Sequence, residues 1–255
     1  MKSLSMKKTN NTSWESSHQW YDTLVGEKGH HYHEHVVLPK SLKLLNLKNG
    51  DSLLDLGCGQ GVLSRKIAAN IDYQGFDLSP SLIKEAKSKS RHAFAVADIT
   101  EPLPLKKKFS HAALILVLQN LENHEKAFEN ASNYLKPGGK FLIVMNHPCF
   151  RIPRQSSWGI DEPKKLQYRR IDRYMEPLKI PIQTHPGQGD SSPSTWSFHH
   201  PLSTYVEGLS KAGFLIQKLE EWLSDKQSTG PKAKMENRSR QEFPLFLALL
   251  ATKII

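Results

Sequence analysis

The sequence has little of the material that disulfide frameworks and membrane spans require. Its 255 residues include two cysteines, Cys58 and Cys149, which are too few for a disulfide framework, so a cytoplasmic location is the simplest expectation. No apolar run approaches the roughly 20 residues of a membrane-spanning helix. The N-terminal segment carries lysines but no apolar stretch, which predicts a soluble tail and no signal peptide.

Acidic residues are fewer than basic ones, and internal repeats are absent. The chain holds 25 Asp and Glu against 35 Lys and Arg, a formal charge of +10. The basic residues are spread out and form no dense stripe with interleaved aromatics, so nucleic acid is a possible but not a favoured partner. Hydrophobic residues make up 38% of the chain, which is enough for a sizeable core and excludes wholesale disorder.

From residue 52 onward, strand-like and helix-like segments alternate. Ser79 followed by Pro80 is typical of a helix start. Alternation of this kind predicts a parallel sheet with helical crossovers. Near the end, two strand-like runs have no expected helix between them and should pair antiparallel. The expected strands are 52–56, 72–76, 93–97, 112–118, 140–145, 214–222 and 243–252, and the expected helices are 61–70, 81–88, 122–135 and 201–212.

The segment 147–200 differs from the rest in composition. Positions 148–201 hold eight of the chain's fifteen prolines, so this segment should not continue the sheet. It also contains Trp158, Tyr168 and Trp196. We therefore expect an ordered insertion that packs over the open end of the sheet.

A glycine-rich turn follows the first expected strand, in the run Asp55-Leu56-Gly57-Cys58-Gly59-Gln60-Gly61. Glycines at a strand–helix turn let a ligand approach the backbone. Asp77 comes 20 residues after Gly57, where a carboxylate can accept hydrogen bonds from ribose hydroxyls. Val62 replaces the third glycine of the dinucleotide fingerprint, Asp55 suits an ammonium group, and Asp98 ends the third strand. The pattern favours an adenosine-type ligand other than a dinucleotide.

Together these residues resemble the class I S-adenosylmethionine-dependent methyltransferases, from about residue 45 to 145. The resemblance implies an α/β, Rossmann-like, seven-stranded and mostly parallel sheet flanked by helices, with the last strand antiparallel and an inserted cap after the fifth strand. It implies S-adenosylmethionine as cofactor and no metal. The residues expected to bind the cofactor are Tyr21, Asp55, Gly57, Cys58, Gly59, Asp77, Leu78, Asp98, Ile99 and Ile115.

On this basis the chain divides into four expected parts. Residues 1–45 form an N-terminal tail and helical lid, and 46–146 form the cofactor-binding core. Residues 147–200 form an inserted substrate cap, and 201–255 supply the C-terminal helix and antiparallel strand pair that complete the core.

The acceptor is less clearly encoded. His147 follows the fifth strand and is the candidate general base, with His199 and His200 as rivals. A purely structural role, with a backbone hydrogen bond at the strand end, is the competing interpretation of His147. Pro148-Cys149 lacks the flanking residues of cytosine methylases, so Cys149 is expected to be structural. The candidate substrate-binding residues are Tyr32, Arg151, Arg154 and His200.

A histidine-rich run, His30-His31-Tyr32-His33-Glu34-His35, suggests a metal, but no third ligand is identifiable, and a lid is preferred. The expected function is methyl transfer to oxygen or carbon of a small-molecule acceptor, as in quinone-biosynthesis methyltransferases. The alternatives are an RNA or protein methyltransferase that docks through its basic surface, and a catalytically idle, cofactor-binding partner subunit.

Overall fold

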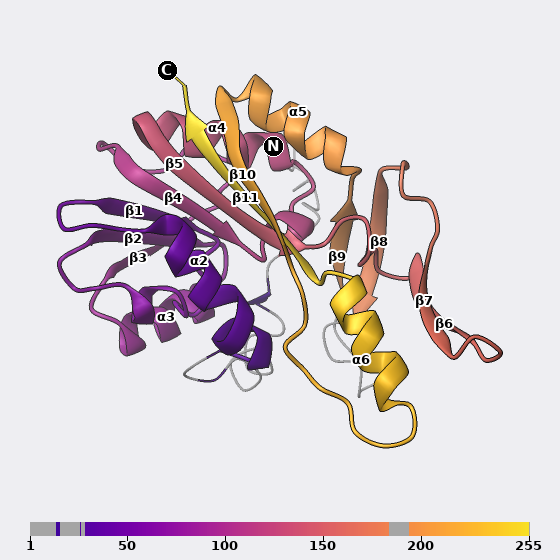
Figure 1. Cartoon of the computed structure of the whole chain (residues 1–255). Helices are drawn as coiled ribbons and strands as arrows, with labels where there is room; N and C mark the ends of the chain where they lie inside the picture. Colours follow the sequence, from indigo (N-terminus) through magenta and orange to yellow (C-terminus); the bar gives the residue numbers. More distant parts are fainter. Residues whose placement is uncertain (1–13, 16–25, 27–28, 184–193, 255) are drawn as a thin grey trace, which may run out of the picture.

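The computed structural model describes residues 14–15, 26, 29–183 and 194–254, and a seven-stranded sheet is its centre (Figure 1). The strand order is β10-β11-β5-β4-β1-β2-β3. The strands are β1 (Ser52–Leu56), β2 (Asp72–Asp77), β3 (Ala93–Val96), β4 (Phe109–Ile115), β5 (Leu135–Asn146), β10 (Phe214–Trp222) and β11 (Phe246–Lys253).

The direction of the strands confirms the expected topology. β1, β2, β3, β4 and β5 pair in parallel. β11 lies between β5 and β10 and is antiparallel to both. The fold is therefore a Rossmann-like, mostly parallel sheet whose last strand is antiparallel. The carboxyl ends of the parallel strands share one edge, which is where open α/β sheets bind their ligands.

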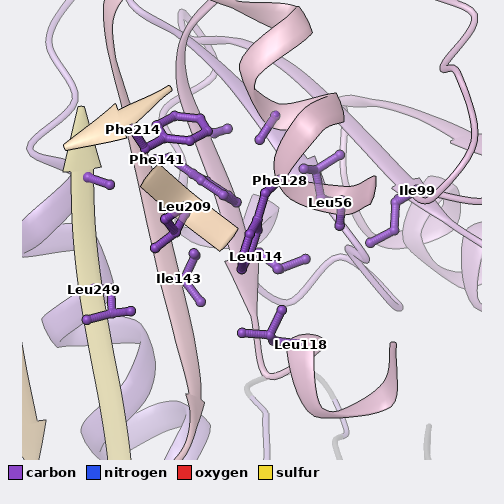
Figure 2. Packing of buried hydrophobic residues seen from close by; sticks show 14 of the residues in the cluster. Leu56, Ile99, Leu114, Leu118, Phe128, Phe141, Ile143, Leu209, Phe214 and Leu249 are labelled. Atoms are coloured by element: carbon purple, nitrogen blue, oxygen red, sulfur yellow. The ribbon is translucent and has the colours of Figure 1, made fainter. Parts of the chain in front are cut away.

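Helices cover both faces of the sheet because its strands are apolar on both sides. Alternate residues of β5 enter different cores, since successive side chains of a strand point to opposite faces: Val144 packs on one face and Ile143 on the other. Helices α2 (Leu38–Leu45) and α3 (Pro80–Lys89) cover the first face, and α4 (His124–Tyr134) and α5 (Leu202–Lys211) the second. Figure 2 shows Phe128 and Leu209 packed with strand residues on that second face.

The segment after β5 forms two hairpins outside the central sheet. β6 (Ser156–Asp161) pairs with β7 (Leu166–Ile171), and β8 (Leu178–Gln183) pairs with β9 (Ser194–His199). Both hairpins lie to one side of the sheet in Figure 1, near helix α6 (Ala233–Glu242). A hydrogen bond of 2.6 Å from Ser239 Oγ to Gln167 Oε1 links α6 to β7.

Three sequence expectations are wrong in detail. Residues 61–70 form turns and one short 3-10 helix, η3 (Ser64–Lys66); the Ser64 hydroxyl donates to Gly61 O (2.7 Å) and competes with helical main-chain bonding. The strand expected at 112–118 is β4, which ends at Ile115. The connection from β10 to β11 contains α6, whose exposed Arg238–Glu242 pair has helical spacing.

A helical segment precedes β1. A five-residue π-helix, η2 (His33–Val37), continues directly into α2. No helix among the described residues is both long and apolar enough to span a bilayer.

Candidate functional site

The turn after β1 is held tightly against β2 and the segment that follows β4. The backbone amides of Gly57 and Cys58 both donate to Phe76 O, at 2.8 and 2.9 Å. Gly57 has a φ of 77°, and a Cβ there would lie 2.5 Å from Val117 Cγ2. Glycine is therefore required at this position for two reasons, backbone conformation and space.

Asp77 ends β2 and connects this turn to the start of α3. Its carboxylate accepts hydrogen bonds from the amides of Gly59 and Ser79, each 2.9 Å long. Burial raises the pKa of Asp77, and those backbone bonds lower it. A carboxylate has about four lone-pair positions, so Asp77 can still accept hydrogen bonds from ligand hydroxyls.

Asp55 lies at the centre of the sheet, 3% exposed. Its Oδ2 accepts a hydrogen bond of 2.5 Å from the Tyr73 hydroxyl. Burial raises the pKa of Asp55 to about 7, with a further contribution from Asp77. Burial, together with Asp55 and Asp77, also raises the pKa of the Cys58 thiol, which keeps it protonated and unsuited to nucleophilic attack.

Further expected cofactor residues lie at the carboxyl ends of β2 and β3. Asp98 Oδ1 accepts from the amide and the hydroxyl of Thr100, at 2.9 and 2.7 Å. Ile99 is buried, and the side chain of Leu78 is 39% exposed. Tyr21 lies outside the described residues. The turn, Asp55, Asp77 and Asp98 thus come together at one edge of the sheet.

Glu15 is a residue of this region that the sequence did not identify. Its carboxylate accepts from the amide (3.1 Å) and hydroxyl (2.6 Å) of Ser81, and it also bonds the hydroxyl of Ser79. A negative charge at this position stabilises the N-terminus of α3. No local sequence signal marks Glu15, because its partners lie more than sixty positions away.

The end of β4 has a strained backbone that the sequence also did not reveal. Leu116 directly follows Ile115 and has a φ of 58°, a conformation that costs free energy in a leucine. Gln119 donates from Nε2 to Leu116 O (2.8 Å). Its Oε1 is buried and has no hydrogen-bond partner among the described residues. Strain and an unpaired acceptor together are typical of a functional edge.

His147 follows β5 and makes two hydrogen bonds. Its Nε2 lies 2.7 Å from Glu221 Oε1, and its Nδ1 accepts from the amide of Cys149 at 3.2 Å. Burial lowers the pKa of His147, while Glu221 raises it. The imidazole would have to release the Cys149 amide before it could accept a proton at Nδ1. Its role as general base therefore stays a prediction.

The expected substrate-binding residues fall into separate groups. Tyr32 packs on Phe246 with ring centroids 5.8 Å apart, and the Arg151 guanidinium lies 5.3 Å from the centroid of the same ring. His200 instead contacts His124, at 4.7 Å between centroids. Arg154 is exposed. The structure thus brings Tyr32 and Arg151 together and places His200 with different neighbours.

The histidine-rich run forms no metal centre. The rings of His31 and His35 lie 4.6 Å apart, and Nε2 of His31 pairs with Asp225 at 3.0 Å. Within the described part of the chain, no group of three or more His, Cys, Asp or Glu residues is arranged to hold a metal ion.

Comparison with known proteins identifies the type of domain. A family model described as a methyltransferase domain matches residues 30–214. A solved S-adenosylmethionine-dependent methyltransferase from Mesorhizobium loti superimposes with a TM-score of 0.66, covering 86% of this chain and 99% of that one, at 23% identity. At this level of identity the structural match shows a shared fold.

Two curated relatives align with part of the chain. One is a malonyl-[acyl-carrier protein] O-methyltransferase of Ilyobacter polytropus, 36% identical over 141 residues, which are 50% of this chain and 51% of that protein. The other is a demethylmenaquinone methyltransferase of Tropheryma whipplei, 27% identical over 112 residues, or 42% and 46%. The chain therefore spans about half the length of the curated relatives it matches.

Proposed function

The chain belongs to the class I S-adenosylmethionine-dependent methyltransferases, and from this premise we propose that it methylates an oxygen or carbon atom of a small-molecule acceptor. S-adenosylmethionine supplies a methyl group on a positively charged sulfur, which makes that methyl electrophilic. The protein's contribution to such a transfer is alignment of the acceptor, exclusion of water and, where needed, removal of a proton.

The single observation that carries the cofactor assignment is the row of carboxylates at the carboxyl ends of β1, β2 and β3. We assign the ribose hydroxyls to Asp77, because both of its oxygens are oriented by backbone amides and retain lone pairs. We assign binding of the cofactor's adenine edge to Asp98 and Ile99. We assign binding of the amino group of its methionine part to the side of the turn where Asp55 lies. A set of carboxylates that accept hydrogen bonds from hydroxyl groups suits a methyl donor that carries a positive charge.

Two features support a small acceptor. The hairpins β6–β7 and β8–β9 follow β5 directly, so they start at the ligand-binding edge of the sheet. Among the relatives, the name of one enzyme states that it acts on demethylmenaquinone, a small molecule. We propose that residues 147–200 form the cap over the acceptor.

The test is methyl incorporation from labelled S-adenosylmethionine into a small-molecule extract. We expect one labelled small product with the wild-type protein and at least about tenfold less of it with the Asp77→Ala variant at limiting cofactor. Label that appears only in macromolecules would overturn the small-molecule assignment.

Methylation of RNA is the second candidate, and the net charge of +10 is the observation in its favour. An enzyme that docks on phosphates releases counterions, so its affinity for RNA falls steeply as the salt concentration rises. A small-molecule enzyme with a solvated basic surface shows weak RNA binding at physiological salt. Phosphate contacts weaken strongly between about 50 and 200 mM salt. Filter binding to unmodified RNA over this range therefore distinguishes the RNA methyltransferase from the small-molecule enzyme.

A further inference from the structure

Arg151 lies at the carboxyl end of β5, on the side of the sheet where the acceptor is expected. Its Nη1 donates to Asn146 Oδ1 (2.7 Å) and to Leu245 O (3.4 Å). Asn146 is the last residue of β5 and pairs with Phe246, the first residue of β11. These bonds fix the guanidinium beside the strand end, over the Phe246 ring.

Among the described residues, the guanidinium of Arg151 has no acidic partner. Both of its hydrogen bonds go to neutral oxygens, and among the described residues no carboxylate forms an ion pair with it. A guanidinium has five N–H donors, so the Nε and Nη2 donors remain without an acceptor in that part of the chain. Nearby carboxylates are engaged elsewhere: Glu221 bonds to His147 and Asp225 to His31.

Further cationic groups lie around Arg151. Lys226 Nζ lies 5.1 Å from the centroid of the Tyr32 ring, which shares Phe246 with Arg151. Burial lowers the pKa of His30, and the charges of Lys226 and Arg151 lower it further. Burial also lowers the pKa of Arg151, and the charge of Arg169 adds to that effect. A partly buried cation among other cations is unfavourable unless an anion joins it.

This cluster also reaches the cofactor turn. His33, the first residue of η2, directly follows Tyr32. Gly29 lies beside both His33 and Val62, the residue after the glycine turn, since a Cβ on Gly29 would lie against His33 Cβ and 3.3 Å from Val62 Cγ1. Phe246 and Val62 belong to one hydrophobic core cluster against which Tyr32 packs, and Arg151 lies over the Phe246 ring. An anion held by Arg151 would lie on the acceptor side of the cofactor.

We propose that the methyl acceptor carries a carboxylate and that Arg151 binds it through the free donors of its guanidinium, an inference that rests on the proposed function. The planar fork of arginine matches the two oxygens of a carboxylate. The Phe246 ring, 5.3 Å from the guanidinium carbon, restricts the orientation of the fork. The exposed ammonium group of Lys226, beside Tyr32, adds long-range attraction for the acceptor carboxylate.

The experiment divides a small-molecule extract on an anion exchanger at neutral pH and assays each fraction with labelled S-adenosylmethionine. We expect incorporation from the retained fraction, abolished when its carboxylates are first converted to amides with carbodiimide and unchanged after phosphatase treatment. Arg151→Gln should raise the apparent KM for that fraction about tenfold to a hundredfold, the loss expected for one charge-assisted contact. Arg151→Lys should recover part of it.

The controls separate this inference from the proposed function. Arg238→Gln removes an exposed arginine of α6 that pairs with Glu242, outside the proposed cap, and should leave the KM unchanged. Affinity of Arg151→Gln for S-adenosylhomocysteine, measured by calorimetry, should equal that of the wild type and shows that the variant is folded. Incorporation from the unretained fraction, or an unchanged KM in Arg151→Gln, would contradict the inference of an acceptor carboxylate and leave the proposed function in place. Incorporation from neither fraction would remove the proposed function and this inference with it.

Discussion

At the scale of single residues, Asp77 at the end of β2 joins two parts of the cofactor edge. Its two oxygens hold the amide of Gly59 in the turn after β1 and the amide of Ser79 at the start of α3. A change at this carboxylate therefore affects both the ligand contact and the geometry of the turn.

We expect Asp77→Ala to weaken S-adenosylhomocysteine binding by about 1.5–3 kcal/mol, or tenfold or more in affinity, because a charge-assisted hydrogen bond is lost. Titration calorimetry measures the effect directly. Asp72→Ala is the matched control, since Asp72 starts the same strand in an exposed ion pair with Lys107 and such pairs contribute little. Equal affinity in both variants would contradict the assignment of Asp77.

The proposed base is tested by His147→Gln. The glutamine amide can keep a donor toward Glu221 and an acceptor toward the Cys149 amide, but it cannot take up a proton. As a general base, His147 should be needed for turnover, so kcat should fall by about 10²–10⁴-fold with cofactor affinity intact. Turnover near the wild-type value would assign His147 to holding the turn after β5, the role that its two hydrogen bonds perform.

Residues with local signals were predictable from the sequence, and residues with distant partners were not. Gly57 and Asp77 belong to a motif with fixed spacing, and Ser79 followed by Pro80 marks the start of α3. Leu116 was not identified, because nothing in its neighbours requires a positive φ. Its conformation comes from the packing of the β4 end against β5, where its amide bonds Val144 O at 2.7 Å.

At the scale of elements, the segment between β5 and α5 carries two of the chain's five Trp residues, Trp158 and Trp196, and two of its seven Tyr residues, Tyr168 and Tyr174. Arg169 stacks on Trp158 of β6 with 4.9 Å between the guanidinium carbon and the ring centroid. Trp158 in turn contacts Phe243 at the end of α6, 5.4 Å between centroids. These contacts tie the first hairpin to α6.

If residues 147–183 cover the acceptor side, ligand binding should order them. We expect S-adenosylhomocysteine to slow amide hydrogen exchange in residues 57–98, and in residues 29–45 and 147–183 as well, because closure protects their backbone amides. Mass spectrometry of the exchanged protein gives the pattern. The β10–β11 pair serves as internal control. Protection restricted to 57–98 would mean that the hairpins are static packing.

At the scale of the whole molecule, buried neutral histidines couple stability to pH. His33 is 8% exposed, and burial, with a further effect of His30, lowers its pKa to about 3. Burial lowers the pKa of His124 to about 4. Both pKa values lie below the roughly 6.5 of a histidine in the unfolded chain. At pH values between the folded and unfolded pKa, the unfolded state therefore binds more protons.

The free energy of unfolding should therefore be highest above pH 6.5, about the unfolded value, and fall as the pH drops toward 4, by up to about 1.4 kcal/mol per pH unit for each such histidine. Urea unfolding at several pH values measures this slope. We expect His33→Gln to flatten it, while His35→Gln, at an exposed position of the same helix, should leave it unchanged. Equal slopes in wild type and His33→Gln would contradict the linkage.

The sequence alone determined the sheet, its antiparallel last strand and the edge that holds the cofactor motif. These follow from local periodicity, from turn residues and from spacing along adjacent strands. The insertion was visible as a change in composition, but its two hairpins were not.

Only the tertiary structure decided which side chains meet across the edge. Arg151 and Tyr32 share the Phe246 ring, while His200, also expected at the substrate, lies against His124. Helix α6 was missed because its mean hydropathy is low and its stability depends on β7 and on pairs of charges along its own surface. Contacts between residues a hundred positions apart depend on how the layers pack, and no local pattern in the sequence records that packing.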